Sequence, residues 1–337
     1  MNRNDFLLSV GFAGAGLTAR RGDRSPGSIA AMQEPTTGIV NVKQAGAKGD
    51  GTTEDAGAIQ AALDGLASHG GGEVHFPAGS YRISTTIMLR DNVSLIGSMG
   101  TPTTSRSSPV SLLYAGTGAA FQCHKSSDHP GGYLGIRIRG FYLLDIGGKG
   151  TRGFDLDGYT WCTLEDCGIE GFDFGIFTKD DWYARYTNLM IAGARDTGAV
   201  FSSNSNSARF TNLRLSAMAA GAKGAMRLEY AKGVVLDNVC VETNTDGLTF
   251  NHCLGVAVHG VYYENASNAQ PEFGVLISNC SGVALDGVFM NGNHHTKRGI
   301  YLFGDNHAVT IAGAYAINFQ EKDVVGPVNE IGMMHGS

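Results

Sequence analysis

Proline, charge and paired cysteines are all scarce in this sequence. Only 8 of its 337 residues are proline and 17% are charged, and its composition is not that of a disordered proline- and glycine-rich tract. The six cysteines include no CxxC pair and no zinc-type spacing, so we expect most of them to be small buried hydrophobes. The net charge is −6 and there is no long basic run, so nucleic acid is not an expected partner.

No apolar run is long enough to cross a membrane. The run at residues 6–19 is too short for a bilayer, and it lies between a short polar start and a polar stretch rich in Pro, Ser and Gly. This order is typical of an export signal, and we expect a secreted or periplasmic protein. The segment NRNDFL resembles a twin-arginine signal with Asn4 in place of the second arginine. We assign residues 1–35 to this leader, or alternatively to an unstructured extension, and residues 36–337 to one domain.

Glycine, in contrast, is abundant. The 49 glycines are about twice the usual share, and together with β-branched runs they indicate many tight turns. The segment VAVHGVYYENAS at residues 256–267 alternates like a strand, breaks at Gly260 and alternates again. Equivalent breaks recur every 22 to 27 residues and are always Gly, Asn or Asp, which best tolerate a left-handed backbone. These predicted bends are Gly140, Asp166, Asn188, Asn212, Asn238, Gly260, Gly287 and Gly313.

A second glycine column has the same period. Its members are Gly153, Gly175, Gly198, Gly224, Gly247, Gly274 and Gly299. Each repeat therefore reads as strand a, a bend, strand b, a variable loop, a glycine, strand c and a short turn. Repeats of this length with three short strands predict an all-β fold, a parallel β-helix whose strands pair with their equivalents one turn away.

A helix is expected before the first repeats. Thr52 or Thr53 could cap a helix over residues 53–68 that carries Glu54 and Asp55 in its first turn. Its apolar stripe, Ile59, Leu63 and Leu66, would cover the open edge of the first turn of the coil.

The N-terminal part of the domain resembles the opening of the pectate lyase superfamily. The resemblance covers residues 41–98 and is carried by NVK at 41–43, GAKGDG at 46–51, AIQ at 58–60 and FPAGSY at 76–81. It implies a right-handed parallel β-helix, found in exported polysaccharide lyases, glycoside hydrolases, uronan epimerases and phage tailspikes. These residues belong to the scaffold, so the resemblance indicates the fold and not the reaction.

The same resemblance implies that a polysaccharide lies along the outer face of the c strands. The candidate catalytic residues there are Asp180, Asp181, Glu229 and His252. The candidate substrate-binding residues on this face, and in the loops 265–273 and 291–298 beside it, are Asp155, Asp157, Lys179, Arg227, Asn251, His294, His295 and Arg298. We expect Asp180, Asp181 and Glu229 to be exposed, so that replacing any one of them by alanine would abolish turnover and leave stability almost unchanged. The plainer alternative is that outward positions of a solenoid are polar in any case.

Two reactions suit such a face. Glycoside hydrolysis needs two suitably spaced carboxyl groups, and β-elimination needs a base for the proton next to a uronate carboxylate, together with cations. Asp180 and Asp181 resemble the paired aspartates of polygalacturonases, but the Gly-His-Gly and Arg-Ile-Lys motifs of that family are missing. GFDLDG at 153–158 resembles the Gly-Phe-Asp-Pro-His motif of epimerases, with Leu156 and Asp157 in place of proline and histidine.

Cofactor, partners and function follow from this interpretation. The four aspartates Asp155, Asp157, Asp180 and Asp181 could hold Ca²⁺, since hard oxygen ligands suit it, but no other cofactor is indicated. We expect a polysaccharide lyase or a glycoside hydrolase. The rival is a non-catalytic polysaccharide-binding or tailspike-like structural protein, and a homotrimer is one arrangement that such a protein could adopt.

Strands a and b carry a second set of outward residues. The repeat stacks His259 between Asp237 and Asp286, Glu264 on Glu242, and Tyr262 on Phe289 and Tyr315. These ladders are either solvated or covered by another subunit or loop, or they form a lateral sugar site that includes Glu264. Cys253 and Cys280 share one column in adjacent turns, which permits either a disulfide or a reduced stack.

Overall fold

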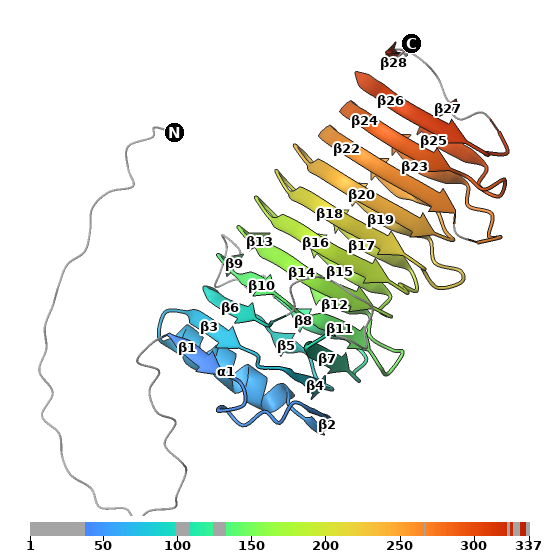
Figure 1. Ribbon diagram of the computed structural model, residues 1–337. Coiled ribbons are helices and arrows are strands. Elements are labelled where there is room, and N and C mark those ends of the chain that lie inside the picture. Colours follow the sequence, from blue (N-terminus) through green and yellow to red (C-terminus); the bar gives the residue numbers. More distant parts are fainter. Residues whose placement is uncertain are drawn as a thin grey trace, which may run out of the picture. The chain divides into compact units, whose positions relative to one another are not determined.

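The fold is the predicted parallel β-helix. The computed structural model describes residues 38–98, 108–123, 133–265 and 267–321, and the backbone of two short strands beyond them. They form a parallel β-solenoid of about ten turns, whose strands stack in sequence order along the coil (Figure 1). The leader expected at residues 1–35 lies outside the described residues. No helix in the described part of the chain could cross a membrane.

Two sheets and a short two-stranded ladder make up the coil. Sheet A has 16 strands and contains both the a and the b segments. Its strands are β1 (Ile39–Asn41), β2 (Asp50–Glu54), β3 (Gly72–His75), β4 (Gly79–Ile83), β6 (Val93–Ile96), β7 (Val110–Tyr114), β10 (Arg137–Arg139), β11 (Tyr142–Asp145), β14 (Thr163–Glu170), β16 (Arg185–Ala192), β18 (Arg209–Ser216), β20 (Val235–Thr243), β22 (Leu254–Asn265), β24 (Ser281–Asn291), β26 (Val309–Ile317) and β28 (Ile331–Met334).

Sheet B has 10 strands and contains the c segments. Its strands are β5 (Ile87–Met88), β8 (Ala119–Gln122), β12 (Arg152–Asp155), β15 (Phe174–Lys179), β17 (Thr197–Ser202), β19 (Gly224–Glu229), β21 (Leu248–Asn251), β23 (Phe273–Ser278), β25 (Arg298–Phe303) and β27 (Val324–Val325). The short ladder consists of β9 (Tyr133–Leu134) and β13 (Tyr159–Thr160).

The bend column is confirmed, but it does not split the strand as expected. All eight predicted bend residues have positive φ, between 52° and 81°. In the later turns, segments a and b nevertheless form one continuous strand of sheet A, as in β20, which passes through Asn238. A single left-handed residue bends the chain without ending the ladder of backbone hydrogen bonds on either side.

The bend residues are also joined by their side chains. Nδ2 of Asn188 donates to Oδ1 of Asp166 at 2.7 Å, Nδ2 of Asn212 to Asn188 at 2.9 Å, and Nδ2 of Asn238 to Asn212 at 3.0 Å. Each asparagine amide thus donates a hydrogen bond to the side-chain oxygen of the bend residue one turn earlier. Asparagine at these bends therefore serves both the left-handed backbone and the contact between turns.

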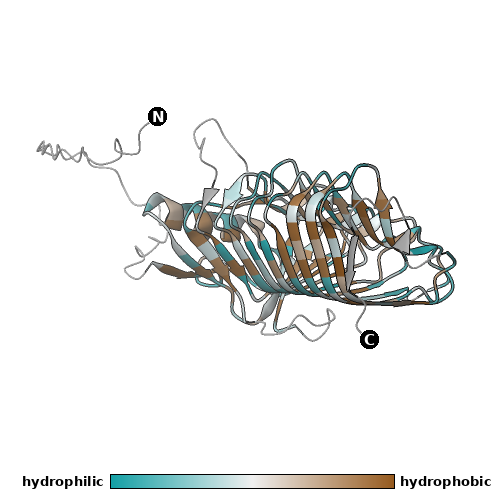
Figure 2. Ribbon diagram, turned by 90° about the horizontal axis from the view of Figure 1, so that it is seen from above, coloured by the Kyte–Doolittle hydropathy of each residue, from teal (hydrophilic) through white to brown (hydrophobic). Residues whose placement is uncertain are grey.

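The second glycine column is confirmed except in one turn. Ala199 pairs with Met226, which places Ala225, and not Gly224, beside Gly198. Inside the coil, aliphatic and aromatic side chains form a continuous core along the described turns. Figure 2 shows the resulting bands of hydrophobic and hydrophilic residues along the strands.

The capping helix is confirmed, although its start differs. Helix α1 (Ala56–Ser68) begins after Asp55, and the hydroxyls of Thr52 and Thr53 donate to Asp50 instead of capping the helix. Ile59, Leu63 and Leu66 are buried, and α1 packs on β1, β3, β5 and β6. The Gln60 amide accepts from the backbone N of Met88 at 2.7 Å and donates to its carbonyl at 3.1 Å, so the helix closes the edge of sheet B at β5.

Cys253 and Cys280 do lie in one column of adjacent turns. Both are buried free thiols, and the backbone N of Cys253 donates to Sγ of Cys280 at 3.3 Å. The structure therefore contains the reduced stack, the second of the two expected alternatives.

Candidate functional site

The outward columns of the c strands follow the expected register. Arg227 pairs across β19 and β21 with Thr249, and Glu229 pairs with Asn251. Two turns earlier, Lys179 of β15 pairs with Ser202 of β17. The sequence therefore predicted which side chains share this face, but two of the aspartates assigned to it have unexpected surroundings.

Asp155 is not an exposed ligand. Its residue is only 2% exposed, and Oδ2 accepts from Nη1 of Arg152 at 2.6 Å and from Nε2 of Gln122 at 3.1 Å. The guanidinium of Arg152 lies over the ring of Phe177, 3.8 Å from its centroid. Asp155 is thus part of an ion pair with Arg152 on the outer face of the c strands, toward the N-terminal end of the coil.

Asp181 corrects the expectation most clearly, because it is fully buried. It points into the coil, where Oδ2 accepts from the hydroxyl of Tyr186 at 3.1 Å and Oδ1 accepts from the hydroxyl of Ser205. Burial raises the pKa of this carboxyl to about 6, against the opposing effect of the two hydroxyl donors. A side chain enclosed in this way cannot contact a polymer on the outer surface.

Asp180, the neighbouring residue, does lie at the surface corner. The corner is the short turn between each c strand and the next sheet A strand, and it opens with a left-handed residue in successive turns: Asp180, Ser203, Tyr230, His252 and Asn279. Oδ1 of Asp180 accepts from Nε1 of Trp182 and from Nδ2 of Asn204, both at 3.1 Å.

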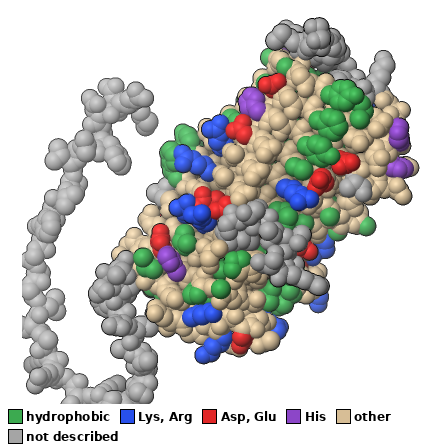
Figure 3. Space-filling model, in the orientation of Figure 1, with side chains coloured by type: hydrophobic (Ala, Val, Ile, Leu, Met, Phe, Trp, Pro, Cys, Tyr) green, Lys and Arg blue, Asp and Glu red, His purple; other side chains and the backbone are tan. Residues whose placement is uncertain are grey.

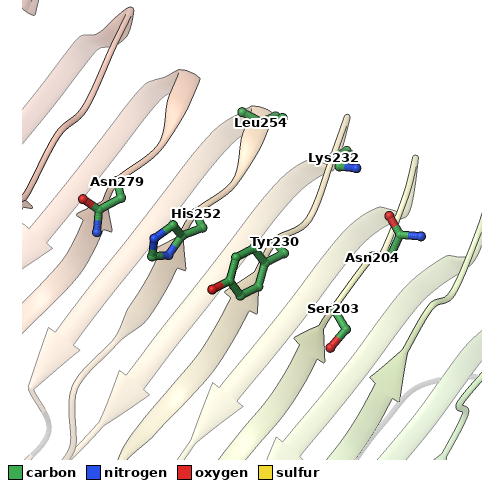
Figure 4. Close-up of a pocket in the computed structure, with 7 residues that line it drawn as sticks. All are labelled: Ser203, Asn204, Tyr230, Lys232, His252, Leu254 and Asn279. Atoms are coloured by element: carbon green, nitrogen blue, oxygen red, sulfur yellow. The ribbon is translucent and has the colours of Figure 1, made fainter.

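The corner contains a groove that the sequence alone did not reveal as a unit. We define the corner groove by the residues that line a shallow hollow of about 540 Å³: Ser203, Asn204, Tyr230, Lys232, His252, Leu254 and Asn279. Figure 4 shows Ser203, Tyr230, His252 and Asn279 following one another at the ends of successive c strands, with Lys232 and Leu254 in a second row. The hollow therefore extends along the coil axis across several turns.

Two rings and a free cation dominate the groove. The rings of Tyr230 and His252 stack with centroids 5.0 Å apart and an interplanar angle of 19°. Among the described residues, none forms a hydrogen bond with the Tyr230 hydroxyl or the His252 ring nitrogens, and no carboxylate pairs with Lys232. These polar groups remain available to a ligand.

The predicted face adjoins the groove directly. Glu229 and Asn251 end the strands that lead into Tyr230 and His252, and Glu229 lies 3.5 Å from Nε of Arg227. Lys179 is exposed at the end of β15, and it too has no carboxylate partner within the described ranges. The structure thus brings His252, Glu229, Asn251 and Arg227 together, as the sequence predicted.

Other predicted residues lie elsewhere. Arg298 begins β25, at the opposite end of the c strands from the corner, and pairs with Glu272 at 3.0 Å and Glu321 at 2.8 Å. His294 and His295 belong to the same b–c loop, so none of these residues joins the corner groove. The ion pairs explain Arg298 without any substrate.

Glu264 lies on sheet A, where the expected ladders are confirmed. Tyr262 stacks on Phe289 at 5.5 Å, Phe289 stacks on Tyr315 at 5.9 Å, and the Tyr262 hydroxyl donates to Glu264 at 2.8 Å. Figure 3 shows a row of hydrophobic side chains over β22, β24 and β26. This row and the corner groove are different surfaces.

The four aspartates proposed for Ca²⁺ do not fit that ion. Asp155 is neutralised by Arg152, and Asp181 faces inward toward hydroxyl donors. Among the residues that the structure describes, no three His, Cys, Asp or Glu side chains gather in a way that could hold a metal.

Sequence reasoning missed Tyr230 and Lys232. The repeat itself contained the information. Tyr230 follows its c strand at the same position as His252 does in the next turn, and Lys232 corresponds in the same way to Leu254. Extending the columns through the short turn, and not only through the strands, would have placed Tyr230 beside His252.

Comparisons with known proteins agree with the fold. Residues 39–122 match the family model described as "Rhamnogalacturonase A/epimerase, pectate lyase-like". Mannuronan C5-epimerase AlgE3 of Azotobacter vinelandii is 48% identical over 67 residues, which are 18% of this chain and 4% of that protein. This chain therefore matches only a small part of its curated relative.

Two solved structures share the coil over most of the described chain. ORF18 of Geobacillus virus E2 has a TM-score of 0.66 at 17% identity, with 88% of this chain and 60% of that chain covered. The A-module of mannuronan C-5 epimerase AlgE4 of Azotobacter vinelandii has a TM-score of 0.57 at 16% identity, with 88% and 100% covered. At these identities the likeness concerns the fold alone.

Proposed function

Because this chain is a pectate lyase-like parallel β-helix, we propose that it acts on an acidic polysaccharide, a uronan, held in the corner groove and on the adjoining face of the c strands. The observation that carries the proposal is the groove itself, where a free cation, an unpaired imidazole and a tyrosine hydroxyl line one hollow. The short, strong similarity to a mannuronan C5-epimerase supports a uronan as the polymer.

We assign the chemistry to removal of the C5 proton of a uronate residue. That carbon carries the carboxylate, so the proton becomes more acidic when a cation neutralises the carboxylate charge. In this proposal Lys232 contacts the carboxylate, His252 accepts the proton, and the Tyr230 hydroxyl donates a proton to the departing oxygen on C4. The C5–H and C4–O bonds break, a C4–C5 double bond forms, and the polymer is cleaved by β-elimination.

Elimination is favoured over hydrolysis by the state of the carboxylates. Hydrolysis needs two carboxyl groups on either side of the bond to be cleaved. Asp181 is buried, and Asp155 is both buried and paired with Arg152. Asp180 accepts from Trp182 and Asn204, Glu229 lies 3.5 Å from Arg227, and none of the described residues that line the hollow is a carboxylate. Elimination requires only one base and a cation, which the corner groove contains.

A panel of polymannuronate, polyguluronate and polygalacturonate tests this function. Elimination produces unsaturated ends that absorb ultraviolet light, hydrolysis produces reducing ends without that absorbance, and epimerisation changes the C5 proton resonances without cleavage. We expect unsaturated product from the wild type and a loss of at least a hundredfold in His252→Ala. Calorimetric binding without any product would support the non-catalytic alternative, and the absence of binding to every polymer would refute the proposal.

Export and assembly remain part of the proposal. An extracellular polymer would agree with the leader expected at residues 1–35, and cell fractionation of the full chain tests this. A mass measurement in solution tests the expected homotrimer.

A further inference from the structure

A second pair of exposed rings lies on the same corner. Trp161 and Tyr183 are 55% and 46% exposed, and their rings stack with centroids 4.7 Å apart and an interplanar angle of 19°. They occupy equivalent positions of adjacent corner turns, just before β14 and β16. Exposure of this size rules out a role in the core, so another reason for two large aromatic residues is needed.

The backbone conformation at Trp161 and Tyr183 is a further reason to look for a function of these two side chains. Trp161 and Tyr183 have φ of 62° and 58°, in the left-handed region that bulky side chains rarely adopt. In three later turns the equivalent positions are Gly233, Gly255 and Gly282, which reach the same conformation without steric cost. Strained positions of this kind tend to occur where a binding function selects the side chain.

Among the residues that the structure describes, small residues flank the pair of rings at both ends. The residue beside Trp161 in the preceding turn is Gly135, and the residue beside Tyr183 in the following turn is Ser207. Neither can cover an aromatic face. Within the described part of the chain no hydrogen bond engages Nε1 of Trp161 or the hydroxyl of Tyr183, so the polar atoms are available too.

A third exposed ring at this corner, Trp182, is held by polar groups, which suits a sugar better than an apolar partner. Trp182 is 39% exposed, and its Nε1 donates to Asp180, whose carboxylate also accepts from Asn204 of the groove. Amphipathic rings next to amides and a carboxylate can stack on the apolar face of a sugar and bind its hydroxyls. Trp182 shares a column of the corner turns with Lys232 and Leu254 of the groove, and Trp161 and Tyr183 lie in the next column, one residue further along the chain.

We propose that Trp161, Trp182 and Tyr183 form a second sugar-binding subsite, and that one uronan chain runs along the corner across this subsite and the groove. This inference rests on the proposed function. From the turn of Trp161 to that of His252 there are four strand spacings, about 19 Å, so only a polymer or a long oligomer reaches both. The subsite holds the chain and takes no part in the chemical step.

Tryptophan fluorescence tests the subsite directly, because the two tryptophans of the whole sequence, Trp161 and Trp182, both lie here. Titration with long polymannuronate should change the emission and protect it from acrylamide quenching. A short oligomer that fills only the groove should leave the emission unchanged. Wild-type protein that binds the polymer by calorimetry without any change in emission overturns the subsite while the proposed function stands.

Glycine variants separate binding from structure. Trp161→Gly and Tyr183→Gly each introduce the residue that later turns use, so we expect an unchanged or higher unfolding temperature. We expect each variant to bind long polymannuronate about tenfold more weakly, with short-oligomer binding and kcat unchanged.

Tyr315→Gly, at an exposed ring of sheet A, is the matched control and should bind normally. If Trp161→Gly and Tyr183→Gly bind the polymer as tightly as the wild type, the subsite is refuted. If they unfold at a clearly lower temperature, the rings are structural and the inference is also refuted. If the wild type binds no uronan, the proposed function itself has failed.

Discussion

Asp181 gives the most discriminating prediction, because its sequence position and its environment imply opposite roles. As an exposed catalytic carboxylate it would affect activity and not stability. As the buried group that the structure shows, with its pKa raised from 3.8 to about 6, it should affect stability in a pH-dependent manner. The perturbation to make is Asp181→Asn, which keeps one acceptor oxygen for one of the two hydroxyls, offers an amide N–H to the other hydroxyl oxygen, and removes the titration.

The sign follows from proton binding. Between pH 3.8 and about 6 the folded state holds the Asp181 proton while the unfolded state has released it. The stabilisation of the folded state by the proton on Asp181 is therefore fully present below the pKa of the unfolded state. It is lost as the pH rises through the pKa of the folded state. The difference between the two pKa values corresponds to about 3 kcal/mol, of which about 2 kcal/mol is expressed between pH 4 and pH 8.

The assay is thermal unfolding of wild type and Asp181→Asn from pH 4 to pH 8. Other titrating groups are common to both proteins and cancel in the difference. We expect the variant to gain about 2 kcal/mol relative to the wild type as pH rises, or about 3 to 4 °C for a domain of this size. Parallel curves for the two proteins would refute the buried, raised-pKa carboxyl.

Asp181→Ala is the companion variant. It leaves the buried hydroxyls of Ser205 and Tyr186 without their acceptor, and we expect it to be less stable than Asp181→Asn by about 1–3 kcal/mol. Full stability of Asp181→Ala combined with complete loss of turnover would restore the catalytic role that the sequence suggested.

Three further predictions concern the bend, the cap and the groove. Asn212→Val should cost on the order of 1–2 kcal/mol for the left-handed backbone, besides the ladder bonds, and unfolding by urea should show it; no loss would contradict the role of the bend. Gln60→Ala should lower the free energy of unfolding by about 1–2 kcal/mol and speed hydrogen exchange of the Met88 amide. Unchanged exchange would show that α1 does not protect the edge of sheet B. Glu229→Ala should reduce turnover without lowering the unfolding temperature, whereas His259→Ala on sheet A should leave turnover intact; the reverse pattern would move the site to sheet A.

Much of the coil could be predicted from the sequence, because its determinants are local and repeat. A left-handed bend admits few residue types, so the Gly, Asn and Asp column marked the bends, and period-two alternation marked the inward residues of each strand. The core stripe of α1 followed from helical spacing in the same way. Even the stacking of Tyr262 on Phe289 followed, since equal positions of adjacent turns become neighbours.

The candidate site was harder to predict, because it lies in the corner turns, where the alternation of inward and outward side chains stops. In the corner turns that open with Asp180, Tyr230, His252 and Asn279, a left-handed residue rotates the chain, and the residue after it is buried whatever its polarity. Asp181 follows Asp180 in this way and shares an inward column with Ser205 and Cys253. No rule of composition predicts a buried aspartate at that place, and burial was decided by the path of the backbone.

Spacing and local backbone preference were enough to predict the repeat, the fold and nearly all members of each column, with Gly224 as the exception. Which polar residues are accessible and which are paired could not be predicted from spacing and became visible in the folded coil. Accessibility depends on neighbours from other turns: Arg152 neutralises Asp155, Ser205 and Tyr186 enclose Asp181, and nothing in the described turns engages Lys232. The groove arises because residues 22 to 27 positions apart in the sequence are stacked about 4.8 Å from one another, and that juxtaposition exists only in the folded coil.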